Sequence, residues 1–190
     1  MPGDGEAAPL GLGRGKVFPA DHARSLLNPA RRLVQSPTRT VAAMDLAEDA
    51  RVLELGCGPG FFSPHLAAVA GQLVLVDLQS EMLVLARERL DRGQGTGFAQ
   101  ADGAALPVAD GSFDAVLLAT VLGEIPDPAA CVAEVRRVLR PGGTLSIAET
   151  RRDSDYIPPA DLQRLIEPRG FALVARRGPR WQYVARFRRD

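Results

Sequence analysis

The chain has 190 residues, of which 46% are hydrophobic and 24% charged, and this length and composition suit one globular domain with a single core. Lysine plus arginine and aspartate plus glutamate both number 23, so no overall basic field exists to gather nucleic acid or anionic lipid. The two cysteines give neither a metal-ligand spacing nor a disulfide framework. Without an apolar leader or a bilayer-spanning apolar run, the expected protein is soluble and cytoplasmic, with no metal centre.

The N-terminal part of the chain divides into a tail and a helical region. Residues 1–15 are rich in glycine and proline and are expected to form a disordered tail. From Phe18 to Leu46 apolar residues recur at helical spacing, Asn28-Pro29 interrupts the pattern, and Ser36-Pro37 offers a cap and first turn for a helix that reaches Met44. This region is therefore expected to form two short helices. The folded domain is therefore expected to occupy residues 16–190, with these helices preceding the first strand.

From Arg51 onward, short apolar runs alternate with segments of helical spacing, and Ser80 is expected to cap one of these helices. The alternation predicts helix-covered parallel strands, and the short connection between the last two strands predicts antiparallel pairing. The expected fold class is α/β: a doubly wound, Rossmann-like, seven-stranded and mostly parallel sheet with an antiparallel C-terminal strand pair. Strands are expected at residues 52–55, 73–76, 98–101, 113–119, 144–148, 171–175 and 181–187, and helices at 62–69, 82–90, 128–139 and 159–166.

Residues 52–60, VLELGCGPG, run from a buried strand directly into a Gly-x-Gly-x-Gly turn. Glycines at 56 and 58 let the backbone curl tightly and approach a ligand without a Cβ atom. A dinucleotide site would place its third glycine at position 61, which is Phe61, and a P-loop needs a Gly-Lys-Ser or Gly-Lys-Thr sequence that the chain lacks. The turn therefore favours a ligand without phosphates.

Asp77 ends the second expected strand about 20 residues after the first glycine of the turn, where a carboxylate can accept hydrogen bonds from both hydroxyls of a ribose. The alternative is that Asp77 only caps a helix or is solvated at the end of the strand. Beside the glycine turn, Asp77 favours a ligand that contains a nucleoside.

Further motifs follow in a fixed order: ADGA at 101–104 after the third expected strand, SFDA at 112–115 before the fourth, and LRPGG at 139–143 before the fifth. Together with the glycine turn and Asp77, they resemble the class I S-adenosylmethionine-dependent methyltransferases, particularly the small ones similar to the quinone-biosynthesis methyltransferases, over residues 50–150. The resemblance implies the cofactor S-adenosylmethionine and the product S-adenosylhomocysteine.

The resemblance also implies which residues contact the cofactor. The turn backbone would lie against the methionine part, with Glu54 close to its amino group, while Asp77 would bind the ribose and Leu78 would pack on adenine. Asp102 would accept from the adenine amine, unless Asp102-Gly103 is an ordinary turn. The full implied set is Glu54, Gly56, Cys57, Gly58, Asp77, Leu78, Asp102, Gly103, Ala104 and Thr120.

The sequence indicates fewer residues for the binding of the methyl acceptor than for the binding of the cofactor. Glu124, just after the fourth expected strand, is the first candidate for a catalytic base or a substrate contact, against a capping or solvent-facing role. Phe18 and His22 are expected either to belong to an apolar lid over the substrate or to close the edge of the sheet. Tyr156 lies in a segment that forms a second candidate wall.

The expected function is methyl transfer from S-adenosylmethionine to a small, partly apolar molecule. A non-catalytic module that keeps the nucleoside pocket is the alternative from another class. The last 40 residues contain ten arginines and five acids, which makes an RNA methyltransferase a third and less favoured hypothesis, because such arginines commonly form the charged edge of a strand pair. The sequence does not indicate an oligomeric state.

Overall fold

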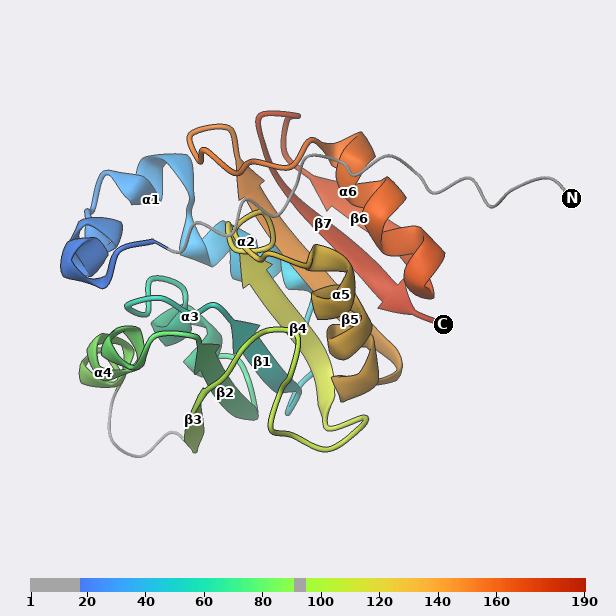
Figure 1. Ribbon diagram of the computed structural model, residues 1–190, viewed down its shortest axis with the longest axis horizontal. Coiled ribbons are helices and arrows are strands. Elements are labelled where there is room, and N and C mark those ends of the chain that lie inside the picture. The colour runs from blue at the N-terminus through green and yellow to red at the C-terminus, as the bar shows by residue number, and fades with distance from the viewer. Residues whose placement is uncertain (1–17, 91–94) are drawn as a thin grey trace, which may run out of the picture.

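The computed structural model describes residues 18–90 and 95–190, and the tail expected at residues 1–15 lies outside the described residues. Figure 1 shows a central sheet with helices packed against both of its faces. The seven strands are β1 (Arg51–Leu55), β2 (Gln72–Asp77), β3 (Thr96–Gln100), β4 (Phe113–Ala119), β5 (Leu139–Thr150), β6 (Phe171–Arg177) and β7 (Gln182–Arg189).

The strands lie in the order β3-β2-β1-β4-β5-β7-β6. Strands β1 to β5 run parallel to one another, whereas β7 is antiparallel to both β5 and β6. The predicted fold class is therefore confirmed. Because β7 inserts between β5 and β6, the sheet is complete only after residues 182–189 have joined it.

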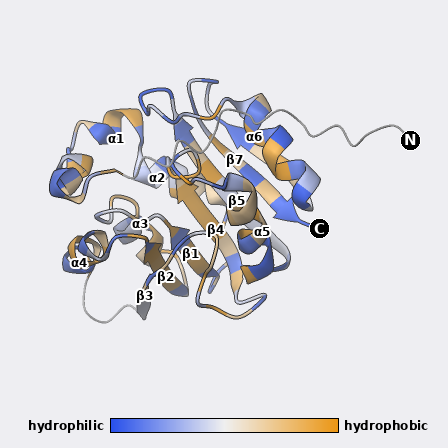
Figure 2. Cartoon of the chain, in the orientation of Figure 1, coloured by the Kyte–Doolittle hydropathy of each residue, from blue (hydrophilic) through white to orange (hydrophobic). Residues whose placement is uncertain are grey.

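Helices cover the two faces of the sheet in separate groups. One buried cluster joins α2, α3 and α4 to one face, and a second cluster joins α5 and α6 to the other. Figure 2 shows hydrophobic residues concentrated along the central strands, with hydrophilic residues on the outer helices. The helices are η1, a 3-10 helix (Ala20–Leu27), α1 (Arg31–Val34), α2 (Pro37–Met44), α3 (Ser63–Ala67), α4 (Ser80–Glu88), α5 (Pro128–Val138), α6 (Pro159–Ile166) and the 3-10 helix η2 (Glu167–Arg169).

Alternation along β1 shows why both faces need a cover. Val52 packs in the cluster with α2, α3 and α4, whereas Leu53 and Leu55 pack in the cluster with α5 and α6. Successive side chains of a strand point to opposite faces, so a strand that is apolar at every position must be buried on both. The apolar run at the start of the glycine motif is therefore a strand that is buried on both faces of the sheet.

The N-terminal region differs from the prediction, since residues 18–46 form three short helices instead of two. Asn28 precedes a proline and has extended backbone angles (φ −53°, ψ 124°), which ends η1. Gln35 is also non-helical, and α2 starts anew at Pro37 with the Ser36 hydroxyl accepting from the Arg39 amide at 3.4 Å. The predicted interruption at Asn28-Pro29 and the predicted helix start at Ser36-Pro37 are thus confirmed, and the unexpected element is the short helix α1 between them.

Other element boundaries also differ from the prediction, and two of them have a local cause. The predicted cap at Ser80 is wrong by one position, because Gln79 is the N-cap and the Ser80 hydroxyl lies 3.2 Å from the Glu81 carboxylate. Strand β5 begins earlier than expected because Leu139 already pairs with Phe113, before a shift in register. Within the described ranges 18–90 and 95–190, no helix has the length and apolarity needed to cross a membrane.

Candidate cofactor and acceptor site

The glycine turn lies at the carboxyl end of β1, next to the end of β2. Gly56, Gly58 and Gly60 have φ values of +70°, +53° and +80°, a region that L side chains disfavour. A Cβ on Gly56 would lie 2.5 Å from a methyl carbon of Val121, so this glycine is also required by close packing. The amides of Gly56 and Cys57 both donate to the Val76 carbonyl, at 2.8 and 3.1 Å, and tie the turn to β2.

The Asp77 carboxylate connects the end of β2 to the glycine turn. Its Oδ2 accepts from the Gly58 amide at 2.8 Å, and its Oδ1 accepts from the Gln79 amide at 3.0 Å. Burial raises the pKa of Asp77, and these amide bonds oppose the rise. A carboxylate has about four acceptor positions, so two amide bonds leave capacity for ligand hydroxyls.

Glu54 is deeply buried, with 2% of its surface exposed. Its Oε2 accepts from the Ser63 hydroxyl at 2.6 Å, which joins β1 to the start of α3. Burial raises the pKa of Glu54 to about 8. The structure therefore places this carboxylate within the scaffold of the turn, and the contact with a cofactor amino group remains a prediction.

The expected adenine end lies at the ends of β2 and β3. Leu78 is 50% exposed directly after Asp77 and offers an apolar surface to a flat ring. Asp102 Oδ1 accepts from the Ala104 amide at 2.9 Å, so one carboxylate oxygen forms the ordinary turn that the sequence left open as an alternative. Gly103 has little space, since a Cβ there would lie 3.3 Å from Ile125.

Thr120, at the end of β4, has an unusual backbone for a β-branched residue, with φ +56°. Its amide donates to the Ala148 carbonyl at 2.9 Å, and its hydroxyl donates to the Ala119 carbonyl at 2.7 Å. The hydroxyl oxygen also accepts from Nη2 of Arg31 at 3.3 Å. Such strain concentrates at functional sites, and here it presents Thr120 toward the N-terminal helices.

Arg31 is a site residue that the sequence analysis missed. Its guanidinium carbon lies 4.6 Å from the ring centroid of Phe61 and 5.9 Å from that of Phe62, within cation–π range. Two of its nitrogens donate to Gln35 Oε1, at 3.2 and 3.1 Å. Arg31 therefore fixes α1 beside the glycine turn. Its contact with Thr120 joins residues 89 positions apart in the sequence, and local spacing does not predict such a contact.

Glu124 lies in the loop after β4, where the sequence predicted it. Burial raises the pKa of its carboxyl to about 7, with a further contribution from the negative charge of Asp153. Interaction with the Phe18 backbone opposes this rise, and the Phe18 carbonyl accepts from Gln79 Nε2 at 2.9 Å. Phe18 therefore bridges the ends of β4 and β2 across the site.

A second contact also brings the N-terminal segment to the glycine turn. A Cβ placed on Gly58 would meet only the Leu26 side chain, 3.9 Å away. Phe18 and Leu26 together place this segment over the carboxyl ends of the strands, in the position of a lid. His22 is not brought to the site, since its side chain is 70% exposed and its one ion-pair contact is with Asp21, at 3.8 Å.

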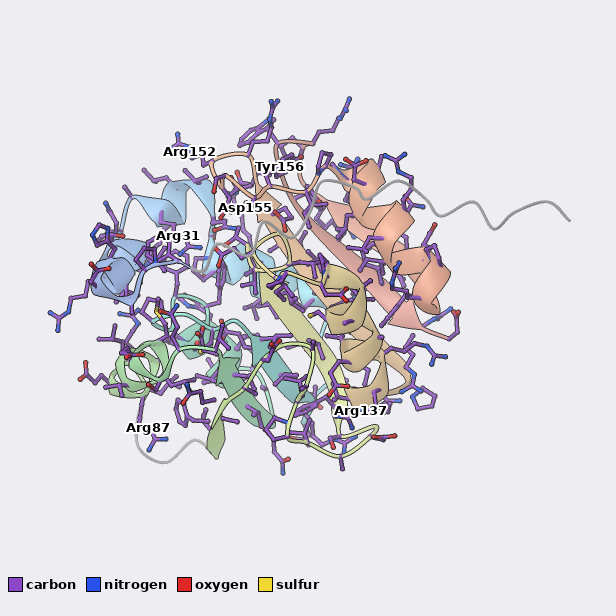
Figure 3. The ribbon with its side chains drawn as sticks, in the orientation of Figure 1. Arg31, Arg87, Arg137, Arg152, Asp155 and Tyr156 are labelled. Carbon is purple, nitrogen blue, oxygen red and sulfur yellow. The ribbon has the colours of Figure 1, made fainter. Side chains whose placement is uncertain are left out.

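Tyr156 lies on the loop after β5 and not among the cofactor residues. Its hydroxyl donates to the Arg180 carbonyl, and its ring packs edge-on against Tyr183 with centroids 6.2 Å apart. Figure 3 shows Tyr156 and Asp155 in the upper part of the view, with Arg31 below them beside α1. Tyr156 thus borders the predicted acceptor side through its loop and β7.

A family described as a methyltransferase domain matches residues 53–147, which is 95 of the 190 residues. The chain belongs to the methyltransferase domain family. The predicted membership in the class I S-adenosylmethionine-dependent methyltransferases is confirmed.

Relatives and solved structures agree with this membership. The chain is 37% identical over 132 residues to a demethylmenaquinone methyltransferase of Parafrankia sp. (strain EAN1pec), covering 60% of this chain and 52% of that protein. It is 32% identical over 149 residues to a ubiquinone/menaquinone biosynthesis C-methyltransferase of Shewanella piezotolerans, covering 71% and 57%. The chain thus spans little more than half the length of these two relatives.

The fold itself is similar to a crystal structure of an S-adenosylmethionine-dependent methyltransferase from Aquifex aeolicus. The TM-score is 0.79, at 22% identity, over 90% of this chain and 98% of that one. At this identity the likeness shows the shared fold.

Proposed function

We propose that this protein binds S-adenosylmethionine at the glycine turn and transfers its methyl group to a small, partly apolar molecule. The observation that carries the proposal is the meeting of the glycine turn with the Asp77 carboxylate at the carboxyl ends of β1 and β2, in a chain that belongs to a methyltransferase family. Ligands of open α/β sheets bind at this edge.

The residues present fit the cofactor in its separate parts. The turn backbone at Gly56 and Gly58, free of side chains, would lie against the methionine part. The free acceptor positions of Asp77 suit the ribose hydroxyls, and the exposed Leu78 side chain suits the adenine ring. Nothing in the turn provides the lysine that a phosphate-binding loop uses, which supports a cofactor without phosphates.

The methyl group of this cofactor is carried on a sulfonium, so it is already an activated electrophile. The protein has to align the acceptor atom and exclude water. Phe18 and Leu26 cover the site from the N-terminal segment, and we propose that residues 18–46 act as its lid. Glu124, with a pKa near neutrality, is suited to remove a proton from the acceptor.

The nature of the acceptor is supported by the relatives, two of which are named for quinone biosynthesis. Quinone precursors are partly apolar, as are Phe18 and Leu26 of the lid. An acceptor of this kind is therefore the preferred candidate.

The test is turnover of S-adenosylmethionine by the purified protein in the presence of a small-molecule fraction of cell extract. The proposal predicts formation of S-adenosylhomocysteine that requires both the fraction and an intact Asp77, with Asp77→Ala as the comparison. Tight cofactor binding without turnover in any fraction would contradict methyl transfer and favour a non-catalytic binding module.

A further inference from the structure

A cavity of about 580 Å³ lies next to the candidate site, between α1 and α2 on one side and the end of β5 with the β6–β7 turn on the other. This volume is in the range of small-molecule sites. Its wall includes Ala148, whose carbonyl accepts from the Thr120 amide, and Gln35, whose Oε1 accepts from Arg31. The cavity is thus joined to the methyl-transfer site by two direct contacts.

Three cationic side chains stand in the cavity wall on three different elements: Arg32 on α1, Arg39 on α2 and Arg177 on β6. Among the residues that the structure describes, none of these guanidinium groups makes a hydrogen bond or an ion pair, whereas Arg51, Arg137 and Arg186 elsewhere are paired. All three residues are exposed, and unpaired arginines around one hollow provide forked donors for an anion.

The negative charge in the same wall is small. Glu149 is the one acidic residue there, and it is 2% exposed. Burial raises the pKa of Glu149 well above its usual range, which favours its neutral form. The cavity is therefore positively charged despite the overall neutrality of the chain.

Large apolar side chains complete the wall. Leu33 is 90% exposed and Trp181 is 54% exposed, and both line the cavity. Exposed apolar side chains gathered around a hollow mark a binding site more often than scattered ones do. Aromatic and apolar walls with a few convergent polar groups are also typical of small-molecule sites.

We propose that this cavity is the acceptor site and that the acceptor is an apolar ring system or chain carrying one anionic group, such as a carboxylate. This inference rests on the proposed function and adds the charge of the substrate to it. The apolar part would lie against Leu33 and Trp181, and the anionic group would face Arg39 and Arg177. A hollow of this volume suits a small molecule better than an RNA strand.

The test uses the protein loaded with S-adenosylhomocysteine and a matched series of probes: 2-naphthoate, neutral 2-naphthamide and cationic 2-naphthylmethylamine. Trp181 is the single tryptophan of the chain, so its fluorescence reports binding in this cavity directly. We expect 2-naphthoate to bind at least about tenfold more tightly than the amide, as one charge-assisted hydrogen bond would give, and the amine to bind most weakly. Equal or tighter binding of the amide or the amine would overturn the inference.

Single substitutions of the arginines test where the anionic group of the acceptor binds. Arg39→Gln and Arg177→Gln should each weaken 2-naphthoate by roughly tenfold and leave the amide unchanged. Arg188→Gln is the matched control, because Arg188 is an exposed arginine on β7 outside the cavity wall. Displacement of 2-naphthoate by a micromolar single-stranded RNA oligonucleotide would overturn the small-molecule assignment.

Calorimetric titration of the same proteins with S-adenosylhomocysteine, before they are loaded with it, separates this inference from the proposed function. If the cofactor product binds and 2-naphthoate shows no preference over its amide, the acceptor inference fails while the proposed function stands. If S-adenosylhomocysteine does not bind, the proposed function fails, and the acceptor role of the cavity fails with it.

Discussion

At the residue scale, Asp77 both builds and lines the site. The two backbone amides that it accepts from belong to the glycine turn and to the start of α4. Its position at the end of β2 was predictable from strand length and the distance to the glycines. Its bond to Gly58 was not, because that bond depends on how two neighbouring strands end in space.

Substitution of Asp77 should weaken the binding of the cofactor. We expect Asp77→Ala to reduce the affinity for S-adenosylmethionine by roughly tenfold to over a hundredfold, because charge-assisted hydrogen bonds contribute about 1.5 to 3 kcal/mol each. Calorimetry measures the change, with Glu88→Ala, an exposed acidic residue of α4, as the control. Unchanged affinity would remove Asp77 from the site.

The raised pKa of Glu124 predicts how the methyl-transfer rate depends on pH. Its pKa is raised to about 7, mainly by burial, and only the ionised carboxylate can act as a base. The methyl-transfer rate should therefore rise as pH increases through about 7 and level off above it. Glu124→Gln should lower the rate and abolish this rise, whereas Glu88→Gln should keep the wild-type profile. The same rise in Glu124→Gln would assign the titration to another group.

Arg31 shows what the sequence could not reveal at this scale. Its aromatic neighbours Phe61 and Phe62 follow the glycine turn. From the sequence, Phe61 was interpreted only as the residue that replaces the third glycine of a dinucleotide site. The signal that joins them is a cation–π contact between an N-terminal helix and a distant loop. No periodicity in the sequence encodes such a contact, because it depends on tertiary packing.

At the scale of elements, residues 18–36, which precede the core-packed helix α2, contact the site through the Arg31 guanidinium, the Phe18 backbone and the Leu26 side chain. Their helices are short, between four and eight residues, and helices of this length are marginal without tertiary packing. A segment of this kind is suited to open and close.

Removal of the Arg31 contact should therefore loosen the lid selectively. In Arg31→Met we expect amide hydrogen exchange to become faster within residues 18–36 and to stay unchanged in β1 and β4, because a cation–π contact contributes about 0.5 to 2 kcal/mol. Hydrogen exchange with mass spectrometry measures this, and Arg24→Met, an exposed arginine of η1, is the control. Unchanged exchange in residues 18–36 would show that Arg31 does not hold the lid.

Most elements could be predicted because their signals are local. The range 113–119 of β4 and the range 159–166 of α6 follow directly from apolar spacing and from proline at the first helical position. The start of β5 and the three-helix form of the N-terminal segment were missed. The first depends on pairing with β4. The second depends on the short helix α1, which forms between the predicted break at Asn28 and the non-helical Gln35.

At the scale of the whole molecule, β7 completes the fold from within the sheet. It pairs with β5 over seven residue pairs, from Thr144↔Arg188 to Thr150↔Gln182. Tyr183, Ala185 and Phe187 bury their side chains in the core that α5 and α6 cover. The sequence predicted an antiparallel pair, but its insertion next to β5 is a non-local choice that strand spacing does not determine.

The core should therefore depend strongly on β7. Phe187 is 1% exposed, and Phe187→Ala should lower the free energy of unfolding by about 3 to 5 kcal/mol, as expected when a buried ring leaves a cavity. Leu173→Ala, on the partly exposed edge strand β6, should change it by less than about 1 kcal/mol. Urea unfolding followed by circular dichroism measures both, and equal effects would contradict the assigned core.

The central claim is that the glycine turn and Asp77 form a site for S-adenosylmethionine. Calorimetric titration of the purified protein with S-adenosylmethionine, S-adenosylhomocysteine and NAD tests it most directly. The account predicts micromolar binding of the first two and none of NAD, because Phe61 occupies the position of the third dinucleotide glycine. Binding of NAD, or of none of the three, would contradict it.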